Sequence, residues 1–309
     1  MTTHQIEPER RTLHGTFSPD QAPVLTIDPG DTVVYRTLDA GWGTQAPDDE
    51  ASRWRFGPRD PEADAGHALC GPIALRGAGP GAVLAVRVNA LRPGPYGWTW
   101  AGGAPAWAGE RLGISRETTL RWTLDADAMQ GRDQFGHVIP LRPFMGVMGV
   151  APAEPGRHAT APPRATGGNI DCKELVAGST LYLPVAVPGA LFSVGDGHAA
   201  QGDGEVSKTA VECPMEHVSL TFDLAPGPPL RAPRAHTPAG WITFGFHTDL
   251  NEATLLALDD MLDLLGTRYG VERPEALALA SVLVDLRVTQ IANGVHGVHA
   301  ILPHGALRR

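Results

Sequence analysis

Residues 195–205 carry side chains that can bind a metal or move a proton. This stretch holds three carboxylates, one imidazole and one amide within eleven residues, interleaved with glycines. Glycine allows positive φ and a close approach of the backbone to a ligand, and residues two apart on an extended chain project to the same side. Asp196 and His198 form one such pair, and Asp203 and Glu205 form another. A divalent metal or a general-base site requires such a set of side chains.

A second acidic cluster precedes the first in the chain. Residues 167–171 read Gly-Gly-Asn-Ile-Asp, which places Asn169 and Asp171 two apart behind paired glycines. Taken alone, each glycine-flanked cluster is more typical of a tight turn. The density of both together favours a functional site, with the two clusters converging through the strands between them. The chemistry is therefore expected between Gly167 and Glu212.

Short apolar runs separated by glycine and proline predict the strands that must hold these clusters. The 37 glycines and 28 prolines show no collagen-like period and fall mainly between such runs. Residues 24–28 and 32–37 flank one turn at 29–31, and residues 73–76 and 83–88 flank another at 77–81. Both turns suit a bend between antiparallel strands, and hairpins at this spacing favour a sandwich or barrel. Further strand-like runs lie at 180–187, 190–194, 206–211 and 217–223.

The last quarter of the chain changes to helical periodicity. Asp249 and Glu252 form a capping pair, leucines follow at helical spacing, and Gly270 is a plausible end of the helix. Pro274 suits the first turn of a second helix that is predicted to run to about residue 286. Asn293-Gly294 between two apolar runs, 288–292 and 295–302, is the strongest hairpin signal in the sequence.

These elements predict a β-rich α+β fold. We expect an N-terminal antiparallel β-sandwich or barrel unit over residues 1–145 and a central β unit over 146–235 that carries the acidic motifs. A helix–helix–hairpin unit is expected over 236–309. A chain of 309 residues, 42% of them hydrophobic, can bury a substantial core within such units.

Charge and composition exclude several classes of partner. The formal net charge is -9 and there is no basic cluster, so nucleic acids and anionic membranes are not expected to bind. The first residues are polar and no apolar run is long enough to cross a bilayer, which predicts a cytoplasmic protein. The three cysteines are widely spaced and lack a C-x-x-C pair, so they predict neither a disulfide framework nor a thiolate zinc site. No G-x-S-x-G elbow and no H-E-x-x-H helix occurs.

Several motifs together resemble the acetamidase/formamidase family, and the resemblance extends over nearly the whole chain. Weaker matches lie at residues 71–73 with 77–81, and at 297–303. The most specific motifs are PFMGVMGVAP at 143–152, GGNID at 167–171, GSTLYLPV at 178–185 and GALFSVGDGHAAQGDGE at 189–205.

The resemblance implies hydrolysis of short amides such as formamide or acetamide to the acid and ammonia, in a homodimer or larger homo-oligomer with a bound divalent metal. Zinc is the expected metal and calcium the alternative. The metal would polarise the amide carbonyl and lower the pKa of a bound water, and a carboxylate would remove the water's proton and later deliver one to departing ammonia. The site residues would be Asp171 and His198 as metal ligands and Glu205, Asp203 and Asp196 as catalytic groups. From the residues themselves we add Asn169, Gln201 and His67 as substrate contacts, with a surface or structural role as the alternative for His67.

Three residues depart from the family pattern, namely Cys172, Arg76 and Ala82, and they put the substrate in doubt more than the reaction class. Cys172 is not expected to be a nucleophile, because no histidine stands beside it in the sequence and a metal-bound water already supplies the nucleophile.

Two other functions fit the same motifs. A non-catalytic β-sandwich module would hold calcium, although the loop lacks EF-hand spacing and a histidine is a poor calcium ligand. A hydrolase of another small C–N compound, such as a urea-like one, would differ only in the shape of its pocket.

Overall fold

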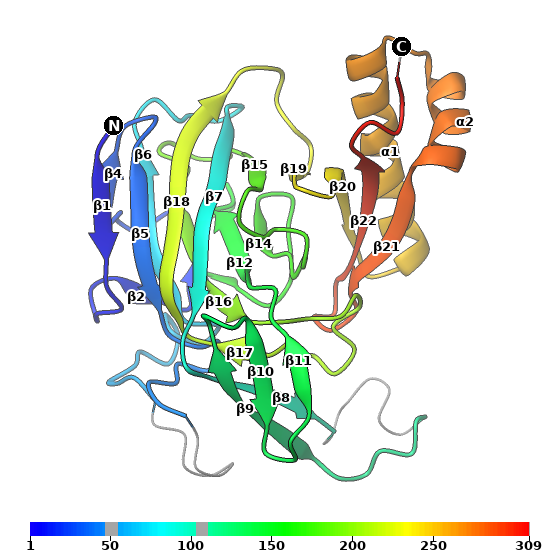
Figure 1. Cartoon of the computed structure of the whole chain (residues 1–309). Coiled ribbons are helices and arrows are strands. Elements are labelled where there is room, and N and C mark those ends of the chain that lie inside the picture. Colours follow the sequence, from blue (N-terminus) through cyan, green and yellow to red (C-terminus); the bar gives the residue numbers. More distant parts are fainter. Residues whose placement is uncertain (47–54, 103–110, 309) are drawn as a thin grey trace.

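The computed structural model describes residues 1–46, 55–102 and 111–308. Two large sheets dominate these residues (Figure 1). The strand order in the first sheet is β1 (Thr3–Ile6), β5 (Thr32–Thr37), β18 (Met215–Ala225), β7 (Val83–Pro93), β15 (Thr180–Pro184), β19 (Arg234–His236), β20 (Gly240–His247), β22 (His296–Pro303) and β21 (Asp285–Gln290). All its pairs are antiparallel except β1 with β5.

The second sheet carries the acidic motifs. Its main path runs through β11 (Val138–Pro140), β10 (Gln130–Asp133), β9 (Thr118–Asp125), β8 (Tyr96–Ala101), β17 (Glu212–Cys213), β16 (Phe192–His198), β12 (Phe144–Val150) and β14 (Gly167–Asn169). Strand β6 (Leu69–Leu75) also pairs with β16, and it joins β2 (Leu13–His14) and β4 (Leu25–Ile27) to the sheet. A separate short pair consists of β3 (Thr16–Phe17) and β13 (His158–Ala159).

The main hydrophobic core lies between the two sheets. One buried cluster takes Phe222 and Leu220 from the first sheet and Phe192 and Met148 from the second. The rings of Phe192 and Phe222 meet edge to face with centroids 5.0 Å apart, a favourable geometry for an aromatic pair. Phe192 and Val194, two apart on β16, both belong to this core.

The predicted β-rich α+β class is confirmed. Strands from all three predicted units enter the nine-stranded sheet, and the division into units at residues 145 and 235 stays a prediction. Within the described residues, no helix is long and apolar enough to span a membrane.

Two predicted hairpins are wrong. Strand β4 pairs with β6 in the second sheet, whereas β5 pairs with β1 and β18 in the first. The glycine-rich turn at 77–81 likewise connects β6 and β7, which belong to different sheets. A tight turn of Pro, Gly and Asp reverses the chain in either arrangement, so turn composition does not tell a hairpin from a crossover between two sheets.

The C-terminal elements follow the prediction closely. Helix α1 (Leu250–Tyr269) begins where the Asp249 side chain accepts the backbone N–H groups of Asn251 and Glu252, and it ends at Gly270 with φ of 65°. Helix α2 (Arg273–Leu283) is shorter than expected, because residue 284 is already extended and β21 follows. The hairpin of β21 and β22 is confirmed, and both helices lie beside it in Figure 1.

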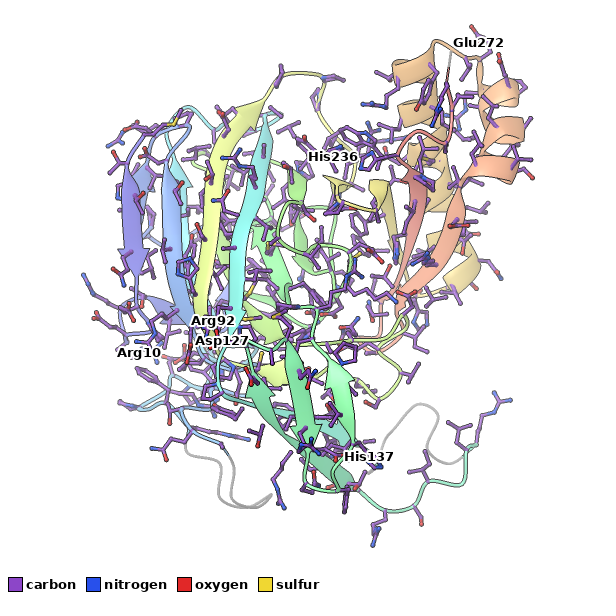
Figure 2. The ribbon with its side chains drawn as sticks, in the orientation of Figure 1. Arg10, Arg92, Asp127, His137, His236 and Glu272 are labelled. Atoms are coloured by element: carbon purple, nitrogen blue, oxygen red, sulfur yellow. The ribbon has the colours of Figure 1, made fainter. Side chains whose placement is uncertain are left out.

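Strands β8 to β11 of the second sheet form an arm that extends beyond the part of this sheet that packs on the first (Figure 1). An ion pair ties this arm to β7, since Arg92 Nη1 lies 2.7 Å from Asp127 Oδ1 in the turn between β9 and β10 (Figure 2). Both side chains are exposed, so the pair adds little stability. The arm matters because its inner face borders the acidic cluster.

Candidate active site

Three neighbouring segments of the second sheet bring the acidic motifs together. Asp196 and His198 lie two apart on β16, and the first residue of β17, Glu212, is directly opposite His198 in the antiparallel register. Asp171 follows β14, and its backbone N–H donates to the carbonyl of Gly146 in β12 at 3.2 Å. The four ionisable side chains are buried together at this edge of the core.

Glu205 completes the cluster from a loop that the C-terminal hairpin holds in place. The backbone N–H of Gly204 donates to the carbonyl of Thr289 at 3.1 Å, and the N–H of Ile291 donates to the carbonyl of Gly204 at 3.0 Å. Glu205 itself is 6% exposed. The chain end therefore helps to place a side chain of the central motif.

The cluster is centred on the imidazole of His198. Its Nε2 lies 3.2 Å from Glu212 Oε2 and 3.3 Å from Asp196 Oδ1, and its Nδ1 lies 4.0 Å from Asp171 Oδ1. Neither ring nitrogen makes a hydrogen bond of good geometry, although both are buried. The ring of Phe144 packs edge-on against it with centroids 5.0 Å apart. The imidazole is thus held by packing while its nitrogens remain available.

Three of these carboxylates stand on left-handed backbone. The φ values are 52° at Asp171, 59° at Asp196 and 45° at Glu205. Such a conformation is uncommon for a residue with a side chain, and most of all for glutamate. Backbone strain of this kind is kept where the surrounding structure enforces it, often at functional sites.

Burial and mutual proximity shift the pKa values of the cluster. Burial raises the pKa of Asp171 to about 8 and that of Glu212 to about 7, and nearby His198 opposes both shifts. Burial also raises the pKa of Glu205 well above its usual value, and Asp171 adds to this shift. Burial opposes ionisation of Asp196, but the charge of His198 holds that pKa below its usual range. Burial lowers the pKa of His198, yet Glu212 and Asp196 more than compensate and keep it well above normal.

The donor atoms match the requirements of a divalent cation. Two overlapping sets, each with donor atoms within 4.8 Å of one another, share His198: one adds Asp171 and Asp196, the other Glu205 and Glu212. Each of these carboxylates has a buried oxygen without a hydrogen-bond partner. Unpaired buried polar groups are costly, and a cation bound between them would offset that cost.

The other predicted site residues lie around this cluster. Gln201 donates from Nε2 to the carbonyl of Asp171 at 2.7 Å, and its Oε1 is buried without a partner. Asn169 is buried and donates to the carbonyl of Ala161 at 3.1 Å. His67 lies near enough for its charge to help lower the pKa of Asp196.

Asp203 stands apart from the cluster. Its side chain is 32% exposed, and it pairs with Lys173 Nζ at 3.1 Å. The i, i+2 relation with Glu205 does not put the two carboxylates together, because the chain turns at Gly204 with φ of 94° and only Glu205 points into the cluster. Alternation holds only on extended chain.

Sequence reasoning missed two members of the site. In the sequence Glu212 marks only the end of the motif region, although a glutamate between Val211 and Cys213 is an unusual charge in an apolar run. The sequence predicts Asn293 only as part of a hairpin turn, yet its Nδ2 donates to Asp171 Oδ2 at 3.0 Å. Its backbone N–H is fixed in turn by Oε1 of buried Gln290 at 3.2 Å.

We expect Asn293→Ala to lower turnover of a small amide by about tenfold, the lower end of the effect of removing a group that orients a metal ligand. The change frees Asp171 Oδ2 to rotate but leaves the carboxylate that would bind the metal. Zinc affinity, measured by competition with a chelator, should fall with activity. The control is Asn251→Ala, on the exposed first turn of α1, which should change neither quantity. An unchanged zinc affinity would contradict the role assigned to Asn293.

Cys172 follows Asp171 directly but is fully buried, and burial raises the pKa of its thiol to about 12. A thiolate nucleophile requires the opposite shift. Cys172→Ala should therefore keep most of the amide turnover and cost about 1 kcal/mol of stability, as for a small cavity in a core. Steady-state kinetics and thermal unfolding would measure both. A loss of turnover comparable to that of an Asp171 variant, with folding intact, would point to a thioester mechanism.

A cavity of about 380 Å³ opens beside the cluster. Glu205, Gln201 and Asp203 line it from the central loop, and Trp122 and Ile139 line it from the arm. Because Glu205 belongs both to this lining and to the buried donor set, the cavity is the candidate route by which a substrate meets the cluster.

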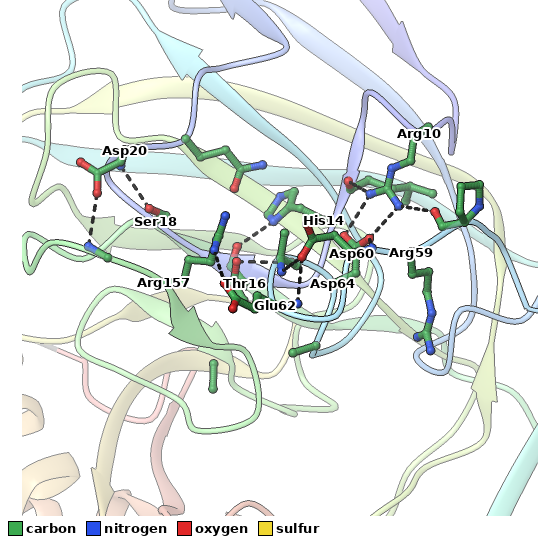
Figure 3. Close-up of a pocket in the computed structure, with 17 residues that line it drawn as sticks. Arg10, His14, Thr16, Ser18, Asp20, Arg59, Asp60, Glu62, Asp64 and Arg157 are labelled. Atoms are coloured by element: carbon green, nitrogen blue, oxygen red, sulfur yellow. Dashed lines mark hydrogen bonds and ion pairs between the residues drawn. The ribbon is translucent and has the colours of Figure 1, made fainter.

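A larger cavity, of about 1100 Å³, is lined by none of these carboxylates; Figure 3 shows the residues that do line it. Its charged side chains pair with one another, Arg10 with Asp64 at 2.7 Å and Arg157 with Glu62 at 3.0 Å. His14 lines it too, and its Nε2 lies 3.0 Å from Ser193 Oγ. Size alone therefore does not mark the active site.

His14 predicts part of the acid sensitivity of the fold. Burial lowers the pKa of this histidine from 6.5 to about 4. At a pH between these two pKa values the imidazole is protonated in the unfolded chain but neutral in the folded chain. The contribution of His14 to the free energy of unfolding is therefore fully present above pH 6.5 and is lost as the pH falls towards 4. Between pH 7.5 and pH 5 the loss should be about 2 kcal/mol smaller in His14→Gln than in the parent chain. Denaturant unfolding at both pH values would test this, and equal losses would contradict it.

Comparison with known proteins gives a consistent result. The acetamidase/formamidase family model matches residues 2–159 and 154–304. A solved acetamidase from Yersinia enterocolitica superimposes with a TM-score of 0.85 at 29% identity, covering 99% of this chain and 93% of that one. A solved acetamidase from Bacillus halodurans gives 0.85 at 27% identity and covers 97% of each chain. Over 48 residues, 16% of this chain and 12% of the relative, the acetamidase of Mycolicibacterium smegmatis is 52% identical. The resemblance inferred from the motifs is confirmed: the chain belongs to the acetamidase/formamidase family and is an amidohydrolase that acts on linear amide C–N bonds.

Proposed function

We propose that this enzyme hydrolyses a short aliphatic amide, of the formamide or acetamide kind, to a carboxylic acid and ammonia with the help of a divalent metal. One observation carries the proposal. The donor atoms of His198 and its carboxylate neighbours converge in the core, and several of them have no other partner. Buried charges of this density are normally paired or coordinate a metal.

Asp171, Asp196 and His198 would hold the metal, with Glu212 available on the other side of the imidazole. Zinc suits this mixture of imidazole nitrogen and carboxylate oxygen. Calcium prefers six or more oxygens and is the second choice. When bound, such a metal polarises an amide carbonyl and makes a water more acidic.

Glu205 is the group best placed to move protons. It is buried within the donor set and also faces the cavity, whereas Asp203 is partly exposed and paired with Lys173. We therefore assign to Glu205 the removal of a proton from the attacking water, whose oxygen bonds to the carbonyl carbon. The same carboxyl then gives the proton to the amide nitrogen as the C–N bond breaks and ammonia leaves. Gln201, whose Oε1 lacks a partner, would accept an N–H of the substrate amide.

Family membership argues against a non-catalytic calcium-binding module. Hydrolysis of a urea-like compound remains the second candidate, since it would use the same groups. We further propose that the enzyme works in the cytoplasm as a homodimer or larger homo-oligomer. Analytical ultracentrifugation would test the oligomeric state, and cell fractionation would test the location.

The experiment is ammonia release from formamide, acetamide, propionamide and urea by metal-stripped protein, before and after reconstitution with zinc or calcium. We expect the stripped protein to be nearly inactive on the three amides and zinc to restore turnover. Equal turnover with and without metal would refute metal assistance. Turnover of urea but of none of the three amides would show that the substrate is a urea-like compound and not an amide.

A further inference from the structure

The cavity beside Glu205 is lined by both polar and apolar side chains. Gln201, Asp203 and Glu205 line it from the loop after β16. The apolar lining from the arm includes Trp122 of β9 and Ile139 of β11. The Nε1 of Trp122 donates to Thr99 Oγ1 at 3.1 Å. This hydrogen bond satisfies the indole N–H and fixes the orientation of the ring.

A further apolar side chain stands at the cavity beside Glu205. Val206 is 69% exposed, and its Cγ1 would lie 3.2 Å from a Cβ added at Gly204. An exposed valine next to a buried proton-transfer group has no packing role that would explain it. Together with Ile139 and Trp122 it contributes an apolar side chain to the lining of this cavity.

The volume of the cavity exceeds what the smallest amides need. One water occupies about 30 Å³ in the liquid, so a three-heavy-atom molecule such as formamide would fill only a minor part of about 380 Å³. Cavities of this size bind ligands with substantial apolar surface. An apolar wall that a substrate leaves uncovered contributes nothing to its recognition.

We propose that the preferred substrate is a primary amide with an apolar acyl group larger than acetyl, whose amide end meets Glu205 and Gln201 and whose acyl end lies against Trp122, Ile139 and Val206. This inference rests on the proposed amide hydrolysis and changes its preferred substrate, from an amide of the formamide or acetamide kind to one with a larger acyl group. Glu205 and Gln201 orient the reacting C–N bond, and the arm of β9 to β11 selects the acyl chain. Binding energy at the arm then places the carbonyl carbon next to the reacting groups.

The test is a homologous series of primary amides, from acetamide through propionamide and butyramide to hexanamide, with phenylacetamide added, assayed by ammonia release on zinc-loaded protein. Each buried methylene should raise kcat/KM about fourfold. Hexanamide should then exceed acetamide by on the order of a hundredfold. If kcat/KM stays flat or falls beyond acetamide, the inference is wrong while amide hydrolysis stands. If no amide releases ammonia, both are wrong.

Two neighbouring residues of β11 locate the acyl site. Ile139 lines the cavity, whereas Val138 is 46% exposed and lies outside that lining. Ile139→Ser should lower the ratio of kcat/KM for hexanamide to that for acetamide about tenfold, and Val138→Ser should leave the ratio unchanged. The ratio does not depend on how much of each variant is folded. An unchanged ratio in Ile139→Ser would place the acyl group elsewhere and overturn the proposal.

Discussion

Replacing Glu205 by glutamine should lower amide turnover by about a hundredfold or more while the protein keeps its metal. Glutamine preserves the size of the side chain and still accepts a hydrogen bond, but it cannot take a proton from water or return one to ammonia. The effect should appear in kcat more than in KM, because the proton moves only after the substrate is bound. Metal content measured by mass spectrometry should equal that of the parent protein.

Asp203→Asn is the matched control for Glu205→Gln. It makes the same chemical change two residues away, on a carboxylate that lies outside the buried donor set and pairs with Lys173. Its turnover should stay within a few-fold of the parent enzyme. A larger loss in Asp203→Asn than in Glu205→Gln would transfer the proton-transfer role to Asp203. Loss of metal from Glu205→Gln would instead make Glu205 a ligand.

Local sequence signals predicted the parts of the site that depend on local structure. Asp196 and His198 lie two apart on one strand, so a single motif brings both to the cluster. Asp249 and Gly270 cap the two ends of α1, and capping needs only the adjacent turn. The same i, i+2 rule gives a wrong position for Asp203, because the turn at Gly204 breaks the alternation of side chains before Glu205.

The missed residues depend on pairing that the sequence does not encode locally. Glu212 joins the site only because β17 pairs with β16 in a register that puts it opposite His198. Asn293 joins it only because the C-terminal hairpin packs beside the loop at Gly204. For the same reason the turn at 29–31 predicts a hairpin, although it connects strands of two different sheets. Contacts between distant segments follow from the packing of the whole core.

Gly146 bears directly on where a cation would lie. A Cβ added to this residue would stand 2.6 Å from Asp196 Oδ2, 2.7 Å from His198 Cε1 and 2.8 Å from Asp171 Oδ1. Those distances are shorter than any ordinary carbon contact, and all three atoms are ends of side chains rather than backbone. The space between the three donor residues is therefore kept open by the absence of a side chain in β12. Its φ is not in the left-handed region, so the backbone itself would accept alanine.

Gly146→Ala should consequently abolish both metal binding and amide turnover in a protein that still folds. The methyl group displaces Asp171, Asp196 and the imidazole from one another, so the geometry that a metal requires is lost. His198→Ala should give the same joint loss by removing the nitrogen donors instead of the space. Gly79→Ala is the matched control, since a Cβ there meets nothing within 4 Å and φ is not positive, and it should keep full metal content and turnover. Metal content after zinc loading, thermal unfolding and ammonia release from acetamide would be measured on all three variants. If Gly146→Ala retains stoichiometric zinc and normal turnover, the metal does not bind between these residues, and the centre of the site must be sought on the Glu205 and Glu212 side of His198.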